Sequence, residues 1–252
     1  MRIRTFLTAL LLVCVPLTGH AAPKAKKPLA VEVAVSSDGQ PLVTLTASNA
    51  PLGEVADRLA AKLGTKIDVS PAARNFKVTT ELDQQPLDLT LRELAPQAYV
   101  DGVLTGGNGK TTVLSIHLRT AGETAPPLEE LSKRASEVFM FSGNTEDAAT
   151  DPLADKLEVT YRNGQMRVLA KQQPVMVVAA RIAETLGIPL ELLGDSLEMV
   201  DISIADASLE QTMRALTPSV KLYHRKDLAT FQMTPVRLVV QAPTAEPAKP
   251  TS

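Results

Sequence analysis

The sequence predicts an α+β fold made of two tandem ββαββαββ modules, in each of which the helices pack on one face of a small mixed sheet. Three observations lead to this prediction. A helical pattern occurs twice at a fixed offset, alternating apolar residues typical of strands surround it both times, and turn-forming residues separate the strands. The first module is expected at residues 30–118 and the second at residues 156–240.

A repeated segment predicts the first helix of each module. Residues 51–64 match residues 174–187 without a gap, at an offset of 123. Each segment begins with proline, which is favourable in the first turn of a helix, and ends with glycine, which commonly caps a helix in the left-handed conformation. Apolar residues recur at spacings of three and four, so each helix has one apolar face. They are Leu52, Val55, Leu59 and Leu63, and then Val175, Val178, Ile182 and Leu186.

Two strands and a shorter helix are expected after each of these helices. A short strand is predicted at residues 66–69 and at residues 189–192, and a strand with alternating apolar residues follows each of them. The alternating strands match at an offset of 122, which indicates that the second module has lost one loop residue. A second helix then ends at a proline, and Ser208 with Gln211 predicts a capping box for the later one.

A hairpin is expected at both ends of each module. The opening hairpins turn at residues 37–39 and at Asn163-Gly164, and Asn-Gly between alternating strands is typical of a type I′ turn. The closing hairpins surround residues 106–109 and Lys226-Asp227. We expect the last return strand at residues 229–233.

The N-terminus has the pattern of a secretory signal peptide. Arg2 and Arg4 precede an apolar run at residues 6–15, which is too short to span a bilayer and is followed by small residues. Cleavage is expected after Ala21, so that residues 1–21 are removed and residues 22–29 form a linker. The sequence therefore predicts export to the periplasm.

The only cysteine, Cys14, lies within this signal peptide. It could be a lipid attachment site, but it follows Val13 where that motif requires a small residue. We expect no lipidation, and after cleavage a chain that has neither disulfides nor thiol chemistry.

A linker and a tail complete the chain. Residues 119–155 join the modules and include a helix candidate near residues 127–141. This helix could dock on a module through its apolar stripe or be a linker helix that touches nothing, and the sequence does not decide between them. Residues 236–240 have the pattern of a further strand, and residues 241–252 are expected to be disordered.

The set of elements resembles a known family of small domains. The resemblance lies in the strand at residues 43–46, the helix at 51–64, the strand at 77–82 and the helix at 86–94. Together they are similar to the secretin and TonB N-terminus short domain, called STN, and to the N-domains of secretins, with the second module a more divergent copy. The resemblance implies a periplasmic interaction module without catalytic residues. No secretin pore or transporter barrel is expected after Gln241.

The composition and the few reactive side chains argue against several functions. With no Trp, three Tyr and a formal net charge of −2, the chain is not expected to bind nucleic acid. His117 and His224 are the only histidines after the signal peptide, and neither has the neighbours of a catalytic set or a zinc site. We expect no enzyme activity, no metal site and no cofactor.

Two polar motifs have simple structural interpretations. Residues 106–111 resemble a phosphate-binding loop, but Leu104 occupies the position of the first glycine and a strand follows where the motif needs a helix. A hairpin turn is the better interpretation. Five acidic residues lack the spacing of a calcium loop and are expected on a solvated surface. They are Glu129, Glu130, Glu146, Asp147 and Asp151.

The remaining mechanism is recognition of other proteins through sheet edges and apolar grooves. Candidate edges are residues 31–35 and 157–162. The sequence thus predicts an adaptor or accessory protein of an envelope machine, with a secretion or pilus secretin, or a TonB-linked signalling system, as partner. The alternative is a module that binds a small molecule or glycan in a cleft between the two copies.

Overall fold

The computed structural model describes residues 29–37, 39–128, 131, 157–194, 196 and 198–241. Several predictions lie outside these residues. They are the signal peptide with its cleavage site at Ala21, Cys14, the linker up to residue 28, most of the helix candidate at 127–141, the five acidic residues above, and the tail after Gln241.

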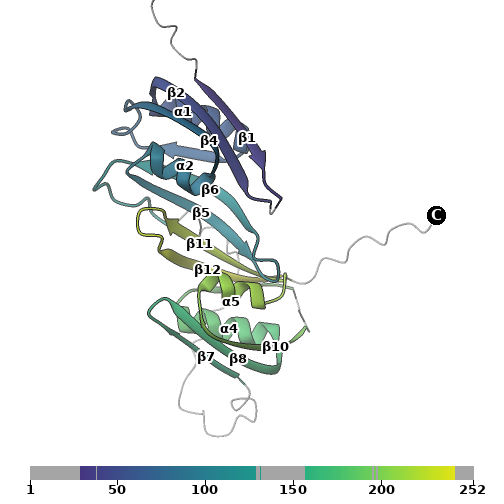
Figure 1. The fold of residues 1–252 in the computed structure, drawn as a ribbon. Helices are drawn as coiled ribbons and strands as arrows, with labels where there is room; N and C mark the ends of the chain where they lie inside the picture. Colours follow the sequence, from purple (N-terminus) through teal and green to yellow (C-terminus); the bar gives the residue numbers. More distant parts are fainter. Residues whose placement is uncertain are drawn as a thin grey trace, which may run out of the picture.

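The described chain has the predicted mixed α+β class and is mostly sheet (Figure 1). None of its described helices is long and apolar enough to cross a membrane. The first half contains β1 (Ala30–Val35), β2 (Pro41–Pro51), α1 (Leu52–Leu63), β3 (Lys66–Val69), β4 (Lys77–Pro86), α2 (Leu87–Leu94), β5 (Gln97–Thr105) and β6 (Thr111–Arg119). The second half contains β7 (Leu157–Arg162), β8 (Gln165–Pro174), α4 (Val175–Leu186), β9 (Leu190–Leu193), β10 (Met199–Ala207), α5 (Leu209–Ala215), β11 (Val220–Asp227) and β12 (Met233–Gln241).

The strands form three sheets rather than one small sheet per module, which corrects the sequence prediction. Two sheets have three strands, in the orders β1-β2-β4 and β10-β8-β7, and a six-stranded sheet has the order β3-β6-β5-β11-β12-β9. The helices of each half lie between a three-stranded sheet and the six-stranded one, as the contacts of α1 with β1, β2 and β3 illustrate (Figure 1). Each half therefore has three layers, and the two halves share a sheet.

The local signals that define turns and caps are confirmed. Asn163 and Gly164 have φ angles of 53° and 79°, as a type I′ turn requires. Gly64 and Gly187 cap α1 and α4 in the left-handed conformation. Ser208 forms the predicted capping box with Gln211 at the start of α5.

The last hairpin differs from its prediction. β11 continues through Lys226 and Asp227, where the turn was predicted, and the return strand β12 begins at Met233. Residues 228–232 therefore form the connection, and residues 236–240 belong to the strand. The reason is that Leu228, in the connection, is fully buried in the core of the first half, which carries the chain away from β11 before it returns.

Each half has its own apolar core, and one residue of each half lies in the core of the other. Leu228 of the second half lies in the core that includes Leu52, Leu59 and Leu91. Leu104 of the first half lies in the core that surrounds α4 and α5. Complete burial of a leucine side chain is worth about 1.5 to 3 kcal/mol, so this exchange stabilises the junction.

Irregular backbone positions recur between the halves. Asn49 and Gln172 have φ angles of 52° and 49°, and Gln84 and Asp206 have φ angles of 46° and 53°. Each pair is separated by the offset of 123 or 122 that relates the helices and alternating strands. In both halves a side chain from the neighbouring strand accepts the N–H of the first of these residues, from Asn49 to Thr79 Oγ1 over 3.0 Å and from Gln172 to Asp201 Oδ1 over 2.9 Å. Both halves therefore have these bulges, although the residue types differ.

Candidate functional site

Both sheet edges that the sequence analysis named are outermost strands. β1 ends the sheet β1-β2-β4, and β7 ends the sheet β10-β8-β7. In the part of the chain that the structure describes, no strand pairs with the outer side of either. An outermost strand directs backbone N–H and C=O groups toward a position that a partner strand can occupy.

The turn after β1 determines which of its backbone groups face outward. Ser36 donates its N–H to Gln40 O over 2.8 Å, so its backbone faces β2. Successive residues of an antiparallel strand direct their backbone groups to opposite sides. The residues whose N–H and C=O groups face outward are therefore Val31, Val33 and Val35.

The same alternation applies to β7. Arg162 and Gln165 flank a two-residue hairpin turn, and such a flanking pair exchanges backbone hydrogen bonds. Arg162, Thr160 and Glu158 therefore direct their backbone groups toward β8. The residues that direct theirs outward are Leu157, Val159 and Tyr161.

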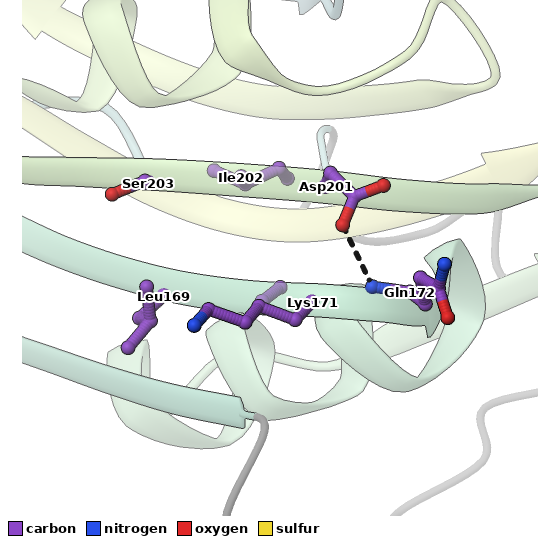
Figure 2. Close-up of a pocket in the computed structure, with 7 residues that line it drawn as sticks. Leu169, Lys171, Gln172, Asp201, Ile202 and Ser203 are labelled. Carbon is purple, nitrogen blue, oxygen red and sulfur yellow. Dashed lines mark hydrogen bonds between the residues drawn. The ribbon is translucent and has the colours of Figure 1, made fainter.

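A shallow hollow of about 550 Å³ lies on β8 and β10 of the second half (Figure 2). Lys171, Asp201 and Ser203 line it together with Leu169, and the Gln172 N–H donates to Asp201 at its end. It lies within the second half rather than between the halves, so it is not the inter-module cleft that the alternative prediction requires.

The junction between the halves is the antiparallel pair β5–β11. Its register runs from Lys221 opposite Thr105 to Asp227 opposite Tyr99. Residues of β5 with even numbers face the helices, and those with odd numbers face the opposite side of the sheet. On that side lies a polar cluster, which consists of Asp101, Arg225, His117, Ser115, Asp68 and Arg119. Pairing of these equivalent strands makes the strand order of the six-stranded sheet symmetric about the junction.

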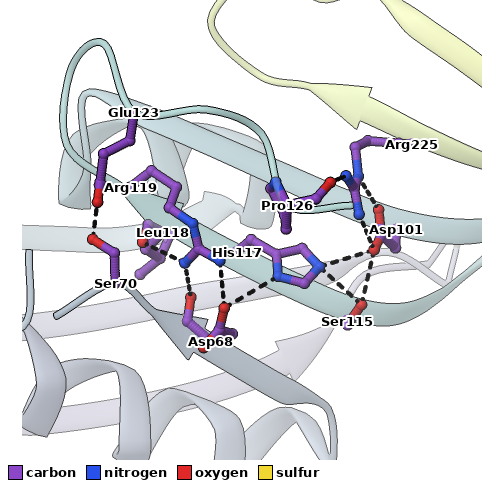
Figure 3. A network of polar contacts seen from close by, with 10 residues as sticks. All are labelled: Asp68, Ser70, Asp101, Ser115, His117, Leu118, Arg119, Glu123, Pro126 and Arg225. Carbon is purple, nitrogen blue, oxygen red and sulfur yellow. Dashed lines mark hydrogen bonds and ion pairs between the residues drawn. The ribbon is translucent and has the colours of Figure 1, made fainter. Parts of the chain in front are cut away.

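An ion pair between buried side chains holds this junction together (Figure 3). Arg225 Nε lies 2.6 Å from Asp101 Oδ1, and Arg225 Nη2 lies 2.8 Å from Asp101 Oδ2, a two-pronged geometry that favours charge pairing. Arg225 Nη1 also donates to the carbonyl oxygen of Pro126, in the segment that follows β6. Arg225 therefore connects β5, β11 and the start of the linker.

His117 extends the cluster toward the edge strand β3 (Figure 3). Its Nε2 lies 2.8 Å from Asp101 Oδ2, and its Nδ1 lies 3.5 Å from Asp68 Oδ2 without hydrogen-bond geometry. Arg119 Nη2 donates to the same Asp68 oxygen over 2.5 Å. The sequence analysis singled out His117 but not its acidic partners.

The cluster includes a serine, a histidine and an aspartate, but they are not arranged as a nucleophilic triad. Such a triad needs the serine on one ring nitrogen and the carboxylate on the other. Here Ser115 Oγ lies 3.3 Å from Nε2, the same nitrogen that contacts Asp101. Ser115 Oγ itself donates to Asp101 Oδ2 over 3.1 Å, so its proton is directed toward the carboxylate rather than the imidazole.

The carboxylates of the cluster are held in their charged form. Burial raises the pKa of Asp101, but hydrogen bonds and charge attraction from Arg225 and His117 outweigh burial and lower this pKa to about 2. Burial also raises the pKa of Asp68, and contacts with Arg119 and His117 lower it overall. The cluster is therefore a network of fixed charges.

His224 lies on the opposite face of the same sheet, beside Gly102. It is 2% exposed, and its Nδ1 lies 3.4 Å from the carbonyl oxygen of Leu222. Burial lowers its pKa, with a smaller opposing effect from this carbonyl oxygen. The two histidines that the sequence analysis considered are therefore both buried and are not brought together.

The glycine-rich turn after β5 is a contact between the halves. A Cβ at Gly106 would overlap the carbonyl oxygen of Thr217, and one at Gly107 would lie 3.0 Å from the Pro218 ring. The N–H groups of Gly106 and Gly107 donate to Val220 O and Met213 O over 2.8 and 3.2 Å. The turn interpretation is thus correct, and the glycines also allow the second half to approach closely.

The described residues contain no group of three or more His, Cys, Asp or Glu side chains placed to hold a metal ion. Searches against protein-family models, curated proteins and solved structures found no match for this chain.

Sequence reasoning missed the junction itself. Asp101 and Arg225 are 124 positions apart, and each lies in a strand whose pattern is that of an ordinary half-buried strand. The available signal was Asp101, the one charged residue in the expected strand at residues 99–105. Arg225 stands beside His224 and Lys226 and had no such signal.

Proposed function

We propose that this chain is an exported periplasmic adaptor that binds envelope proteins by strand addition at its sheet edges. The proposal includes two tandem ββαββαββ copies of an STN-like module. Partners would be components of a secretion or pilus secretin, or of a TonB-linked system. The observation that carries the binding mode is the outermost position of β1, with its row of outward-facing backbone groups.

Recurrence of irregular backbone supports the duplication. The left-handed positions at Asn49 and Gln172, and at Gln84 and Asp206, are costly for residues other than glycine. Their equal spacing to the repeated helices is explained most simply by two copies of one fold. Absence of a family match leaves the STN assignment as part of the proposal.

The β1 edge is suited to bind an extended peptide. Val35 is 73% exposed, and Val33 is half-buried at the border of the first core. A partner strand would bond to the backbone of Val31, Val33 and Val35 and extend the sheet β1-β2-β4. Its alternate side chains would cover the partly exposed valines.

Val33→Pro tests this binding mode. The substitution removes an outward N–H without removing a bond to β2, and proline is tolerated on edge strands. Val33→Ala is the matched control, because it loses packing but keeps the N–H. Wild type and Val33→Ala should recover the same secretin, pilus or TonB-system component from crosslinked envelope extracts, and Val33→Pro should lose it. Equal recovery by all three would contradict strand addition at β1.

Export is tested separately by fractionation and N-terminal sequencing. The mature chain should be found in the periplasm and begin at Ala22. A chain that stays in the cytoplasm with its first residues intact would exclude the proposed compartment.

Small-molecule or glycan binding remains the alternative, and the hollow of about 550 Å³ on β8 and β10 is its best location. A ligand that binds only the folded state raises the melting temperature. Cell-wall fragments or siderophores that raise it in wild type, but not in Lys171→Ala, would favour this function over the adaptor.

A further inference from the structure

β1 and β7 are two of the strands that end a sheet, and they differ in the side chains that face away from the apolar cores. On β7 these are Glu158, Thr160 and Arg162, an acid and a base placed evenly on either side of a threonine. On β1 they are Ala30, Glu32 and Ala34, which include only an acid. When a second β7 runs antiparallel to the first, each acid can therefore lie opposite a base. β1 has no such pattern.

We propose that β7 pairs with β7 of a second copy of this chain, antiparallel and about a two-fold axis at Thr160. In this register Glu158 lies opposite Arg162 of the other copy, and Arg162 lies opposite its Glu158. Thr160 faces its own equivalent. Opposite charges and paired threonines are among the favourable cross-strand neighbours in a sheet.

The backbone of β7 is compatible with this register. Val159 and Tyr161 direct their N–H and C=O groups toward the open edge. Val159 of one copy would therefore form a hydrogen-bonded pair with Tyr161 of the second copy, and Tyr161 with its Val159. Glu158, Thr160 and Arg162 occupy the intervening pairs, in which the side chains approach most closely. The pairs that carry the charges are thus the close ones.

Other two-fold registers do not match the charges. An axis at Val159 would place Glu158 opposite Thr160, and an axis at Tyr161 would place Thr160 opposite Arg162. Only the axis at Thr160 pairs both charged residues of both copies. Glu158 and Arg162 are exposed, and the contact of Glu158 with Arg167 in the same sheet is long, at 3.7 Å.

The apolar side of the pair fits the same arrangement. Leu157, Val159 and Tyr161 are half-buried against the second core, because β7 is the last strand that covers it. In the pair, Val159 would lie beside Tyr161 of the other copy, a combination of aromatic and β-branched side chains that is favourable in sheets. The two three-stranded sheets would become one sheet of six strands.

A C₂ interface of this kind is closed, because each β7 edge covers the other. It leaves β1 at the far end of each copy, so the dimer would present two copies of the proposed partner edge. The inference does not rest on the proposed function, because self-association requires no envelope partner.

Charge reversal tests the register directly. The full mature chain should show a concentration-dependent monomer–dimer equilibrium in sedimentation velocity. Glu158→Arg and Arg162→Glu each place like charges opposite one another and should each weaken the dimer about tenfold or more. The double variant with both reversals should restore it. Circular dichroism and melting temperature verify that each variant is folded.

Mixing the two single variants gives the sharpest result. In the mixture, unlike in either single variant alone, the arginine introduced by Glu158→Arg in one chain lies opposite the glutamate introduced by Arg162→Glu in the other. Each single variant should therefore dimerise more weakly than wild type when alone, and the two should form the tighter heterodimer together. Glu32→Arg on β1 is the matched control and should leave the dimer unchanged.

Three outcomes would overturn the proposal. They are a wild-type chain that stays monomeric up to the highest soluble concentration, a dimer that neither single reversal weakens, and single variants that do not associate when mixed. Val159→Pro, with Val159→Ala as its control, gives a second test, because proline removes an outward N–H and should abolish the dimer.

Discussion

The two halves have the same order of strands and helices but differ on the exposed side of their first helix. In α1, Glu54 and Asp57 pair with Arg58 and Arg74 at 3.1 and 3.6 Å. In α4 the corresponding positions are Val177 and Ala180, and Val177 is 41% exposed. The buried face of both helices is apolar, so the core pattern is kept while the surface is free to differ.

The loop that differs in length explains one further contrast. In the first half a Cβ at Gly53 would lie 2.7 Å from Arg74 Cγ, because the loop after β3 packs closely on α1. Five residues, 194–198, separate β9 from β10, against seven, 70–76, between β3 and β4, and the second half carries Met176 at the position that corresponds to Gly53. The larger side chain is compatible with the shorter loop, so the two halves differ at this position although each keeps its own apolar core.

The largest expected effect is at the junction that joins the halves. Asp101→Ala leaves the buried Arg225 without its charge partner, which should lower the free energy of unfolding by about 3 to 5 kcal/mol. Denaturant unfolding followed by circular dichroism measures this loss. Asp101→Leu with Arg225→Met removes both charges and should cost less than Asp101→Ala. A single loss below about 1 kcal/mol would mean that the halves do not depend on this pair.

A smaller loss is expected from the glycine turn. Gly106→Ala places a Cβ against the carbonyl oxygen of Thr217 and should destabilise the protein by roughly 1 to 3 kcal/mol. Gly39→Ala is the control, because its site is open and only its φ of 77° resists the change, at about 1 kcal/mol. Equal melting temperatures for the two variants would contradict a close contact between the halves at Gly106.

The buried histidine of the second half should make stability depend on pH. Because the pKa of His224 is lowered in the folded state, the unfolded chain binds a proton first as pH falls below about 6.5. Stability should therefore decrease on acidification below that pH. His224→Gln should flatten this dependence in melting curves between about pH 7 and pH 5.

At lower pH the junction should weaken in a separate range. The pKa of Asp101 is lowered to about 2, so its contribution is fully present above about pH 4 and is lost as pH falls toward 2. Asp101→Ala should remove the loss of stability between about pH 4 and pH 2, but it should keep the loss that His224 causes below about pH 6.5.

A wild type equally stable at about pH 7 and pH 5 would contradict the role assigned to His224.

The smallest effects are expected on the exposed helix faces that distinguish the halves. Val177→Glu and Glu54→Val each exchange the residue type of one half for that of the other. Both side chains are largely exposed, so each change in unfolding free energy should stay within about 0.5 kcal/mol. A larger loss for Val177→Glu, measured by denaturant unfolding, would show that Val177 on α4 is covered by other parts of the protein, whereas Glu54 on α1 is not.

Local structure was predictable from the sequence, and the arrangement of the halves was not. The helices at residues 51–64 and 174–187, the Asn163-Gly164 turn and the Ser208 cap follow from neighbouring residues, so short-range patterns suffice. The β5–β11 pair joins strands that are more than a hundred positions apart, and each has the pattern of an ordinary strand.

The candidate site was predictable in part for the same reason. The edge strands β1 and β7 were identified, because each opens a half of the chain and pairs with one neighbour through a short turn. His117 was identified without Asp101, Asp68 or Arg225, since residue type alone does not show which side chains meet across a sheet.

The exchange of Leu104 and Leu228 between the cores has a consequence for synthesis. The N-terminal half leaves the ribosome before β11 exists, so its β5 edge is bare and the place of Leu228 in its core is empty until the second half follows. That interval is when the nascent chain is most exposed to aggregation or to pairing with another chain.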